Sequence, residues 1–172
     1  SFPTRRSSDL GALNTDSEFA GTITNTGGYA TSGLSYNGNY THLIKVGTGR
    51  LTLSGTSNAY NGNITVNGGE LMISGAVAGN KQTAAPKPNT VTVGATGTLL
   101  VTGTLAATTI NVAEGGTLKG TGTITGKTTV NGLLSGKLTF ANELTLNDSL
   151  YIMVSGFADG EYDVVEVQIG RA

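Results

Sequence analysis

Apolar and hydroxyl-bearing residues alternate in short runs along most of the chain, and each run ends near a glycine or an Asn-Gly step. In residues 51–55 leucines alternate with threonine and serine, and residues 64–68 repeat the alternation with isoleucine and valine. A period of two is typical of a strand with one buried face. The pattern predicts short strands within residues 51–55, 64–68, 71–75, 91–94, 99–103, 110–113, 124–126, 129–132, 138–140 and 144–147.

The similarity of these units favours a solenoid over a sandwich or a barrel, whose strands differ more in length and loop type. Glycine-rich breaks, such as residues 115–116 and 131–132, suit abrupt corners with positive φ. In a parallel coil each turn bonds to the next, and equivalent aliphatic side chains stack inside. We therefore expect an all-β parallel solenoid whose interior contains Leu51, Leu53, Ile64, Val66, Leu71, Ile73, Val93, Leu99, Val101, Ile110, Val112, Leu118, Ile124, Val130, Leu138, Leu144, Leu146 and Val154.

Residues 79–89 interrupt this rhythm. They contain Pro86 and Pro88 and show no apolar alternation. Because proline cannot donate to a strand ladder, the segment is expected to leave the stack as a protruding loop.

Composition and charge narrow the class of protein. The 172 residues include 27 glycines, which would destabilise helices. Only 12% of the residues are charged and the net charge is -1, so no basic nucleic-acid-binding surface is expected. The chain has no cysteine, which excludes disulfides and cysteine-based zinc or redox motifs. No apolar run approaches the ~18 residues of a membrane-spanning helix.

We interpret both ends as translated sequencing adapter and not as native protein. Residues 1–10 back-translate to the end of a common short-read adapter, and residues 168–172 to the start of the complementary one. The alternative for the first segment is a basic arm bearing Arg5 and Arg6. The adapter hypothesis leaves residues 11–167 as the β-helix segment, an incomplete fragment without its caps.

Residues 43–71 carry the densest motif of the chain. Its pattern runs L-x-K-x-G-x-G-x-L-x-L-x-G, followed by N-x-Y-x-G, a T/I-x-V step and G-x-L. This resembles the autotransporter-associated β-strand repeat of passenger domains, whose places are occupied by Leu43, Lys45, Gly47, Gly49, Leu51, Leu53, Gly55, Asn58, Tyr60, Gly62, Ile64, Val66, Gly69 and Leu71. Residues 91–99 and 115–124 are similar to the usual continuation of the repeat.

The resemblance implies a right-handed parallel β-helix carried by a secreted or surface-displayed protein of a Gram-negative bacterium. The expected function is that of a structural stalk, which extends an adhesive region from the cell and aids secretion through stepwise stacking. Its implied partners are the rest of the passenger and a C-terminal outer-membrane β-barrel. The resemblance implies neither a cofactor nor catalysis.

The carboxylates and the single histidine are the candidates for catalysis or metal binding. A carbohydrate-active β-helix enzyme would need paired carboxylates on one face, but most acidic residues stand singly beside glycines. The densest group, Asp159, Glu161 and Asp163, could ligate calcium or form a turn. His42 is expected at the surface. We predict no catalytic, metal or cofactor-binding residue.

Tyrosines in the first third of the chain carry the alternative function. Aromatic rings can stack on sugars, so Tyr36, Tyr40 and Tyr60 could form a glycan-binding adhesin surface. For Tyr60 the competing interpretation is packing over a corner of the coil.

Overall fold

The computed structural model describes residues 7–10, 12–23, 42–57, 60, 62–77, 89–148, 150–151 and 166–167, and of strands β1, β19 and β20 only the backbone. The regular structure in these residues consists of short β-strands. No helix in this part of the chain is long and apolar enough to cross a membrane. The predicted all-β class is confirmed.

The strands form three sheets, in which each strand pairs with its equivalents one turn before and one turn after. Sheet A contains β1 (Ser7–Leu10), β3 (His42–Lys45), β6 (Ile64–Val66), β9 (Thr90–Val93), β12 (Thr109–Val112), β15 (Lys127–Val130) and β18 (Leu144–Leu146). Sheet B contains β2 (Ser17–Phe19), β4 (Arg50–Leu53), β7 (Gly69–Ile73), β10 (Gly97–Val101), β13 (Thr117–Gly120), β16 (Leu133–Gly136) and β19 (Leu150–Tyr151). Sheet C contains β5 (Thr56–Ser57), β8 (Ala76–Val77), β11 (Thr104–Leu105), β14 (Thr123–Ile124), β17 (Thr139–Phe140) and β20 (Glu166–Val167).

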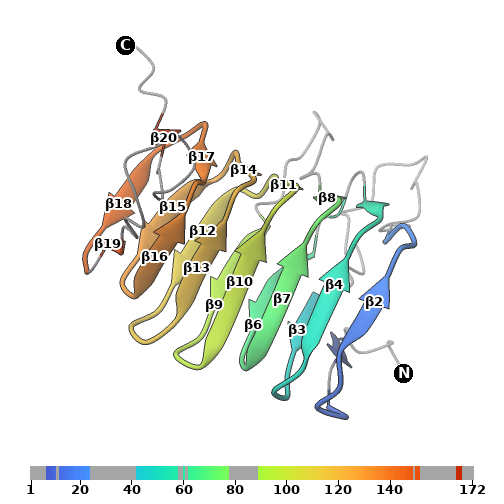
Figure 1. Ribbon diagram of the computed structural model, residues 1–172. Coiled ribbons are helices and arrows are strands. Elements are labelled where there is room, and N and C mark those ends of the chain that lie inside the picture. The colour runs from blue at the N-terminus through green and yellow to red at the C-terminus, as the bar shows by residue number, and fades with distance from the viewer. Residues whose placement is uncertain are drawn as a thin grey trace, which may run out of the picture.

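The chain visits the sheets in the order A, B, C and then repeats, so it winds into a coil. All neighbouring strands are parallel, as in the pairs β4–β7 and β7–β10. Figure 1 shows sheet B rising at the front and sheet A behind it as the chain advances from right to left. This winding is right-handed, the usual hand of parallel crossovers. The architecture is the parallel β-helix that the sequence predicted.

Inward-facing side chains stack in columns because the register places equivalent residues on top of one another. One column of sheet B is Leu51, Leu71, Leu99, Leu118 and Leu134. All five are buried, and burying such a side chain contributes about 1.5–3 kcal/mol. The repeated alternation of the sequence therefore builds one continuous core along the axis.

The predicted interior is confirmed from Leu51 through Leu138. Leu144 is partly buried against the core. The prediction for Leu146 is wrong: the residue is 39% exposed. It stacks on Val130 of β15, and β18 forms the edge of sheet A in the described residues. Val154 lies outside the described residues. Additional core residues are Leu43, Tyr60, Val77, Val91, Leu105, Leu134 and Phe140.

Contacts between equivalent residues give the length of each turn. His42 bonds to Asn63, 21 residues later, and Asn63 bonds to Thr90, 27 residues later. The next step, from Thr90 to Thr109, takes 19 residues, and a later one, from Asn131 to Asn147, takes 16. The 27-residue turn includes the predicted loop, which lies outside the described residues except for Asn89. Asn89 itself is buried and hydrogen-bonded, and the loop before it stays a prediction. The first turn is longer still, at 34 residues from Asn14 to Thr48.

Glycines serve the corners in two ways. Some have positive φ as predicted, including Gly47 at 73° and Gly69 at 60°. Others stack at the corner between sheets B and C, where a side chain on Gly55, Gly75 or Gly103 would overlap a backbone oxygen of the previous turn. Of the breaks named from the sequence, Gly115 has a positive φ of 78°, but the prediction is wrong for residues 131–132. At Gly132, as at Gly55, Gly75 and Gly103, close approach of the turns is what excludes a side chain.

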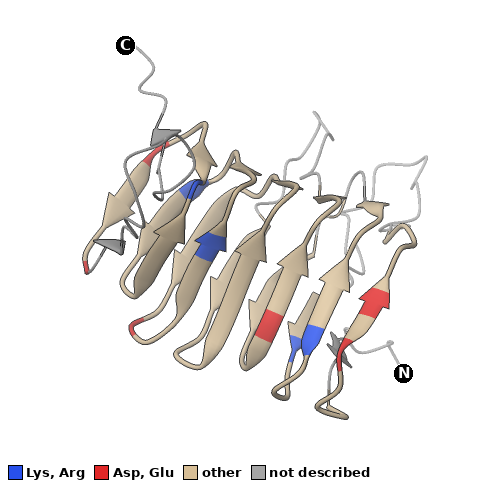
Figure 2. Cartoon of the chain, viewed as in Figure 1, with Lys and Arg blue, Asp and Glu red and all other residues tan. Residues whose placement is uncertain are grey.

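Charged residues are sparse on the walls of the coil (Figure 2). This agrees with the 12% charged composition and with the threonine-rich outward positions of the strands. β1 falls within residues 1–10 and pairs with β3. Strand pairing, however, does not show whether these residues are encoded by the gene or by an adapter. The adapter interpretation of both ends therefore remains a prediction.

Candidate functional site

The most unusual side chain of the core is that of Lys45, at the end of β3. It is fully buried, in a column of sheet A that continues with Val66 and Val93. Its Nζ donates to the carbonyl oxygens of Val46 at 2.7 Å, Gly47 at 3.3 Å and Gly68 at 3.1 Å. Because an ammonium group has three donors, these contacts satisfy it completely.

The charge of Lys45 is affected by its position inside the coil. Burial lowers the pKa of its ammonium group, and the negative charge of Asp16 opposes that shift. A buried amine with saturated donors lacks the free lone pair and the access that a nucleophile or general base needs. The geometry therefore gives Lys45 a structural role in the corner.

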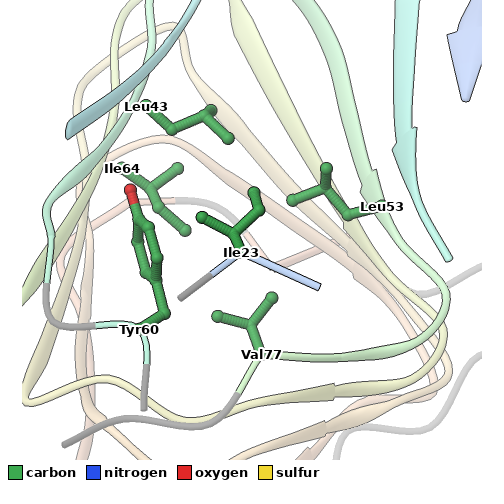
Figure 3. Close-up of a pocket in the computed structure, with 6 residues that line it drawn as sticks. All are labelled: Ile23, Leu43, Leu53, Tyr60, Ile64 and Val77. Atoms are coloured by element: carbon green, nitrogen blue, oxygen red, sulfur yellow. The ribbon is translucent and has the colours of Figure 1, made fainter. Parts of the chain in front are cut away.

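The side chain of Tyr60 is buried in the core, near the N-terminal end of the coil. Figure 3 shows the Tyr60 ring facing Ile23, with Leu43, Leu53, Ile64 and Val77 around the two side chains. These side chains leave no room for a water molecule. The Tyr60 hydroxyl donates to the carbonyl oxygen of Asn63 at 3.1 Å.

This placement corrects the ligand-facing interpretation of Tyr60. Only 2% of the residue is exposed, so neither face of the ring is available to a sugar. Burial raises the pKa of the Tyr60 hydroxyl to about 12, although a hydrogen bond from the backbone of Leu43 acts in the opposite direction. Tyr36 and Tyr40 lie outside the described residues, so their ligand-facing role stays a prediction.

The other repeat residues serve the same stacking. Leu43, Leu51, Leu53, Ile64, Val66 and Leu71 are all buried core residues. Gly47, Gly49, Gly55, Gly62 and Gly69 lie at or beside the corners between strands. Asn58 lies outside the described residues. The described repeat positions therefore face the interior or make the corners.

Glu70 is the most strongly engaged carboxylate on the outer face of sheet B. It forms ion pairs with Arg50, its register partner on β4, and with Lys119 of β13 at 2.8 Å. Burial alone would raise the pKa of Glu70, but hydrogen bonds and charges from Lys119 and Arg50 outweigh it and lower the pKa. Its oxygens are thus committed to two cations, one on the preceding turn and one two turns further along the coil.

The remaining acidic residues of the described ranges do not cluster into a metal site. Within the described ranges no three or more of His, Asp and Glu form a group that could hold a metal ion. Asp159, Glu161 and Asp163, the candidates for calcium, lie outside those ranges. Lys127 and Glu143 form an exposed pair at 2.9 Å.

His42 is half-buried on the outside of β3. Its Nδ1 accepts a hydrogen bond from the backbone N–H of Asn63 at 3.1 Å. The histidine therefore joins one turn to the next.

Polar side chains repeat this linkage from turn to turn, a feature that the alternating sequence pattern does not predict. Asn14 accepts the N–H of Thr48, and Asp16 accepts the N–H of Arg50. In the same way, Asn63 accepts from Thr90 and Asn89 from Thr108. A polar side chain just before a strand, such as Asp16 before β2, Asn63 before β6 or Asn89 before β9, is the sequence signal that could have identified several of these links.

These features define the class of protein: a repeat-built parallel β-helix whose distinctive side chains hold successive turns together. Residues 43–73 match the family model of the passenger-associated-transport-repeat. The match contains the Lys45 corner and confirms the resemblance seen in residues 43–71. It associates this segment with autotransporter passengers. Comparison with curated proteins and with solved structures found no match.

Proposed function

We propose that this chain is a non-catalytic stalk segment of an autotransporter-type passenger, secreted or displayed on the surface of a Gram-negative bacterium. In this role it extends an adhesive region from the cell. The rest of the passenger and an outer-membrane β-barrel are its partners in the proposal. Support comes from the match of residues 43–73 to a passenger-associated-transport-repeat.

The observation that carries the stalk role is the unbroken stacking of the turns. Sheets A and B each continue through seven strands, and every neighbouring pair is parallel and in register. Since each turn contacts mainly its neighbours, such a coil gains length by adding turns without changing its cross-section.

The same geometry supports a contribution to secretion. A newly emerged turn finds strand edges and hydrophobic columns already prepared by the finished turn beside it. Ordering then requires only about 20 residues at a time, as in the step from Arg50 to Glu70. Such stepwise stacking outside the membrane would disfavour return of the chain.

Surface display tests the proposal directly. The chain, with an N-terminal epitope tag, is placed between a signal peptide and the translocator of a known autotransporter in a Gram-negative host. We expect the tag on intact cells, in a form that resists brief proteolysis.

Two neighbouring substitutions on β9 test whether surface display depends on folding of the coil and not only on passage of the chain through the outer membrane. Val93→Asp buries a charge in the core, since Val93 is fully buried, whereas Thr92→Asp places it on the outer face. Val93→Asp should reduce protease-resistant display strongly, and Thr92→Asp should leave it near the wild-type level. Equal display of the two variants would refute a role for coil formation in secretion.

A further inference from the structure

Lys45 places a charged group in the core, where the fold otherwise has aliphatic side chains. In sheet A, an inward-facing column of stacked side chains runs from Lys45 through Val66, Val93, Val112 and Val130. Lys45 is as completely buried as these valines. Burying an ammonium group is costly unless it is fully hydrogen-bonded, so its partners must account for its presence.

Those partners belong to two different corners of the coil. Val46 and Gly47 follow β3 in the second turn, and Gly68 precedes β7 in the third turn. The Nζ of Lys45 donates to the carbonyl oxygens of all three, the bond to Gly68 spanning 23 residues of sequence. One side chain thus connects two corners that are separated by a full turn.

Gly69 provides the space for this connection. A Cβ atom at this position would lie 2.8 Å from the Nζ of Lys45 and 2.6 Å from the carbonyl oxygen of Gly47. Gly69 also has a φ of 60°, which a residue with a side chain rarely adopts. The placement of the Lys45 ammonium group therefore requires a glycine at position 69.

The first turn contributes a charge to the same corner. Asp16 accepts the backbone N–H of Arg50 at 2.7 Å, and its negative charge acts on Lys45. Three successive turns thus take part around one buried ammonium group.

We infer that Lys45 is an internal latch, which fastens the corner of the third turn to that of the second and makes residues 43–73 a locally closed unit of the coil. The latch explains why Lys45, Gly47 and Gly69 occur together in the matched repeat. This inference concerns the chain in solution and does not rest on the proposed role in secretion.

Hydrogen exchange of backbone amides in the full chain tests the latch, with Lys45→Met as the main variant. Methionine retains most of the apolar stem but leaves the three carbonyl oxygens without their donor. Because coils of this kind lose structure locally, we expect protection in residues 64–73 to fall at least ~10-fold. Protection in residues 109–130 should remain at the wild-type level.

Lys137→Met is the matched control, since it removes an ammonium group from an exposed position outside both measured segments. It should leave the protection of residues 64–73 within ~2-fold of wild type. The latch is refuted if Lys45→Met leaves residues 64–73 unchanged or lowers protection equally in residues 109–130. It is also refuted if the control has the same effect as Lys45→Met.

If Lys45→Met does not fold, Asp16→Asn decides the question. Asparagine retains an acceptor for the N–H of Arg50 but removes the charge that favours the buried ammonium. We expect a smaller loss of protection, ~3-fold, confined to residues 43–73. No loss in that segment would overturn the inference.

Discussion

The side-chain oxygen of Asn89 accepts a hydrogen bond from the backbone N–H of Thr108 at 3.0 Å and a second from the Thr108 hydroxyl at 3.3 Å. On its other side, the amide nitrogen of Asn89 donates to the carbonyl oxygen of Tyr60 at 3.4 Å. Tyr60, Asn89 and Thr108 lie at three successive corners between sheets C and A. Asn89 therefore bridges three turns at the point where the 27-residue turn rejoins the stack.

Replacing Asn89 with alanine should destabilise the coil by about 1–2 kcal/mol, because the carbonyl oxygen of buried Tyr60 would lose its donor. The N–H of Thr108 would keep its second acceptor, the backbone carbonyl oxygen of Asn89. The free energy of unfolding can be measured by urea denaturation. Asn111→Ala is the control, since Asn111 is exposed on the outer face of β12 and should change stability by less than ~0.5 kcal/mol. Equal effects of the two substitutions would contradict the bridging role.

The hydroxyl of Tyr60 should ionise at a higher pH than the hydroxyl of an exposed tyrosine. Its folded-state pKa of about 12 lies above the unfolded value of 10.0. The stabilisation from its neutral, buried form is therefore complete below pH 10 and is lost as the pH rises toward 12. The loss amounts to about 2–3 kcal/mol.

Ultraviolet absorbance of tyrosinate during an alkaline titration tests this expectation. The wild-type protein should show a late step near the pH of unfolding, and Tyr60→Phe should lack it. Tyr60→Phe also removes the hydrogen bond to Asn63, at a cost of about 1 kcal/mol below pH 10. If all tyrosines of the wild-type protein titrate together near their usual pKa, the buried placement is incorrect.

The columns of the core could be predicted from the sequence because a period of two reports directly on which side chains point inward. Leu51, Leu71 and Leu99 illustrate this, since each lies in an alternating run and all three stack in register. The motif of residues 43–71 could also be identified, and the family match covers it.

The contacts between turns could not be predicted, because their partners are about 20 residues apart and depend on exact register. Lys45 occupies an inward position, yet nothing in the local pattern reveals that three carbonyl oxygens surround its ammonium group. Tyr60 was ambiguous for a similar reason: its burial depends on Ile23 and Val77, which come from other turns. Leu146 fits the alternating pattern, but the pattern does not show that β18 ends the described part of sheet A.

The ion pairs of Glu70 should make a small contribution to stability that disappears in acid. Because its folded-state pKa is lowered, this contribution is present above the unfolded pKa and is lost as the pH falls through the folded one. The carboxylate side chain is 15% exposed and its partners are much more exposed, so about 0.5–1 kcal/mol is expected at low salt.

Glu70→Gln at neutral pH and low ionic strength should reproduce that loss, and added salt should reduce the difference from wild type. Glu143→Gln affects the pair with Lys127, in which both side chains are more than half exposed, and should have almost no effect. Urea denaturation at two salt concentrations measures both variants. An effect of Glu70→Gln that is independent of salt would exclude an electrostatic origin.

The corner between sheets B and C should tolerate no side chain at its stacked glycines. A methyl group on Gly103 would overlap the carbonyl oxygen of Gly75 in the turn below. Since neither backbone can move without disturbing the neighbouring strand pairs, Gly103→Ala should cost at least about 2 kcal/mol. Gly94→Ala is the matched control: its Cβ would lie 3.4 Å from the carbonyl oxygen of Val66, an ordinary contact, so a change below ~0.5 kcal/mol is expected. The two free energies of unfolding, compared under the same conditions, distinguish close stacking from a general effect of removing glycine. Similar values for both variants would show that the turns do not approach as closely at Gly103 as the structure indicates.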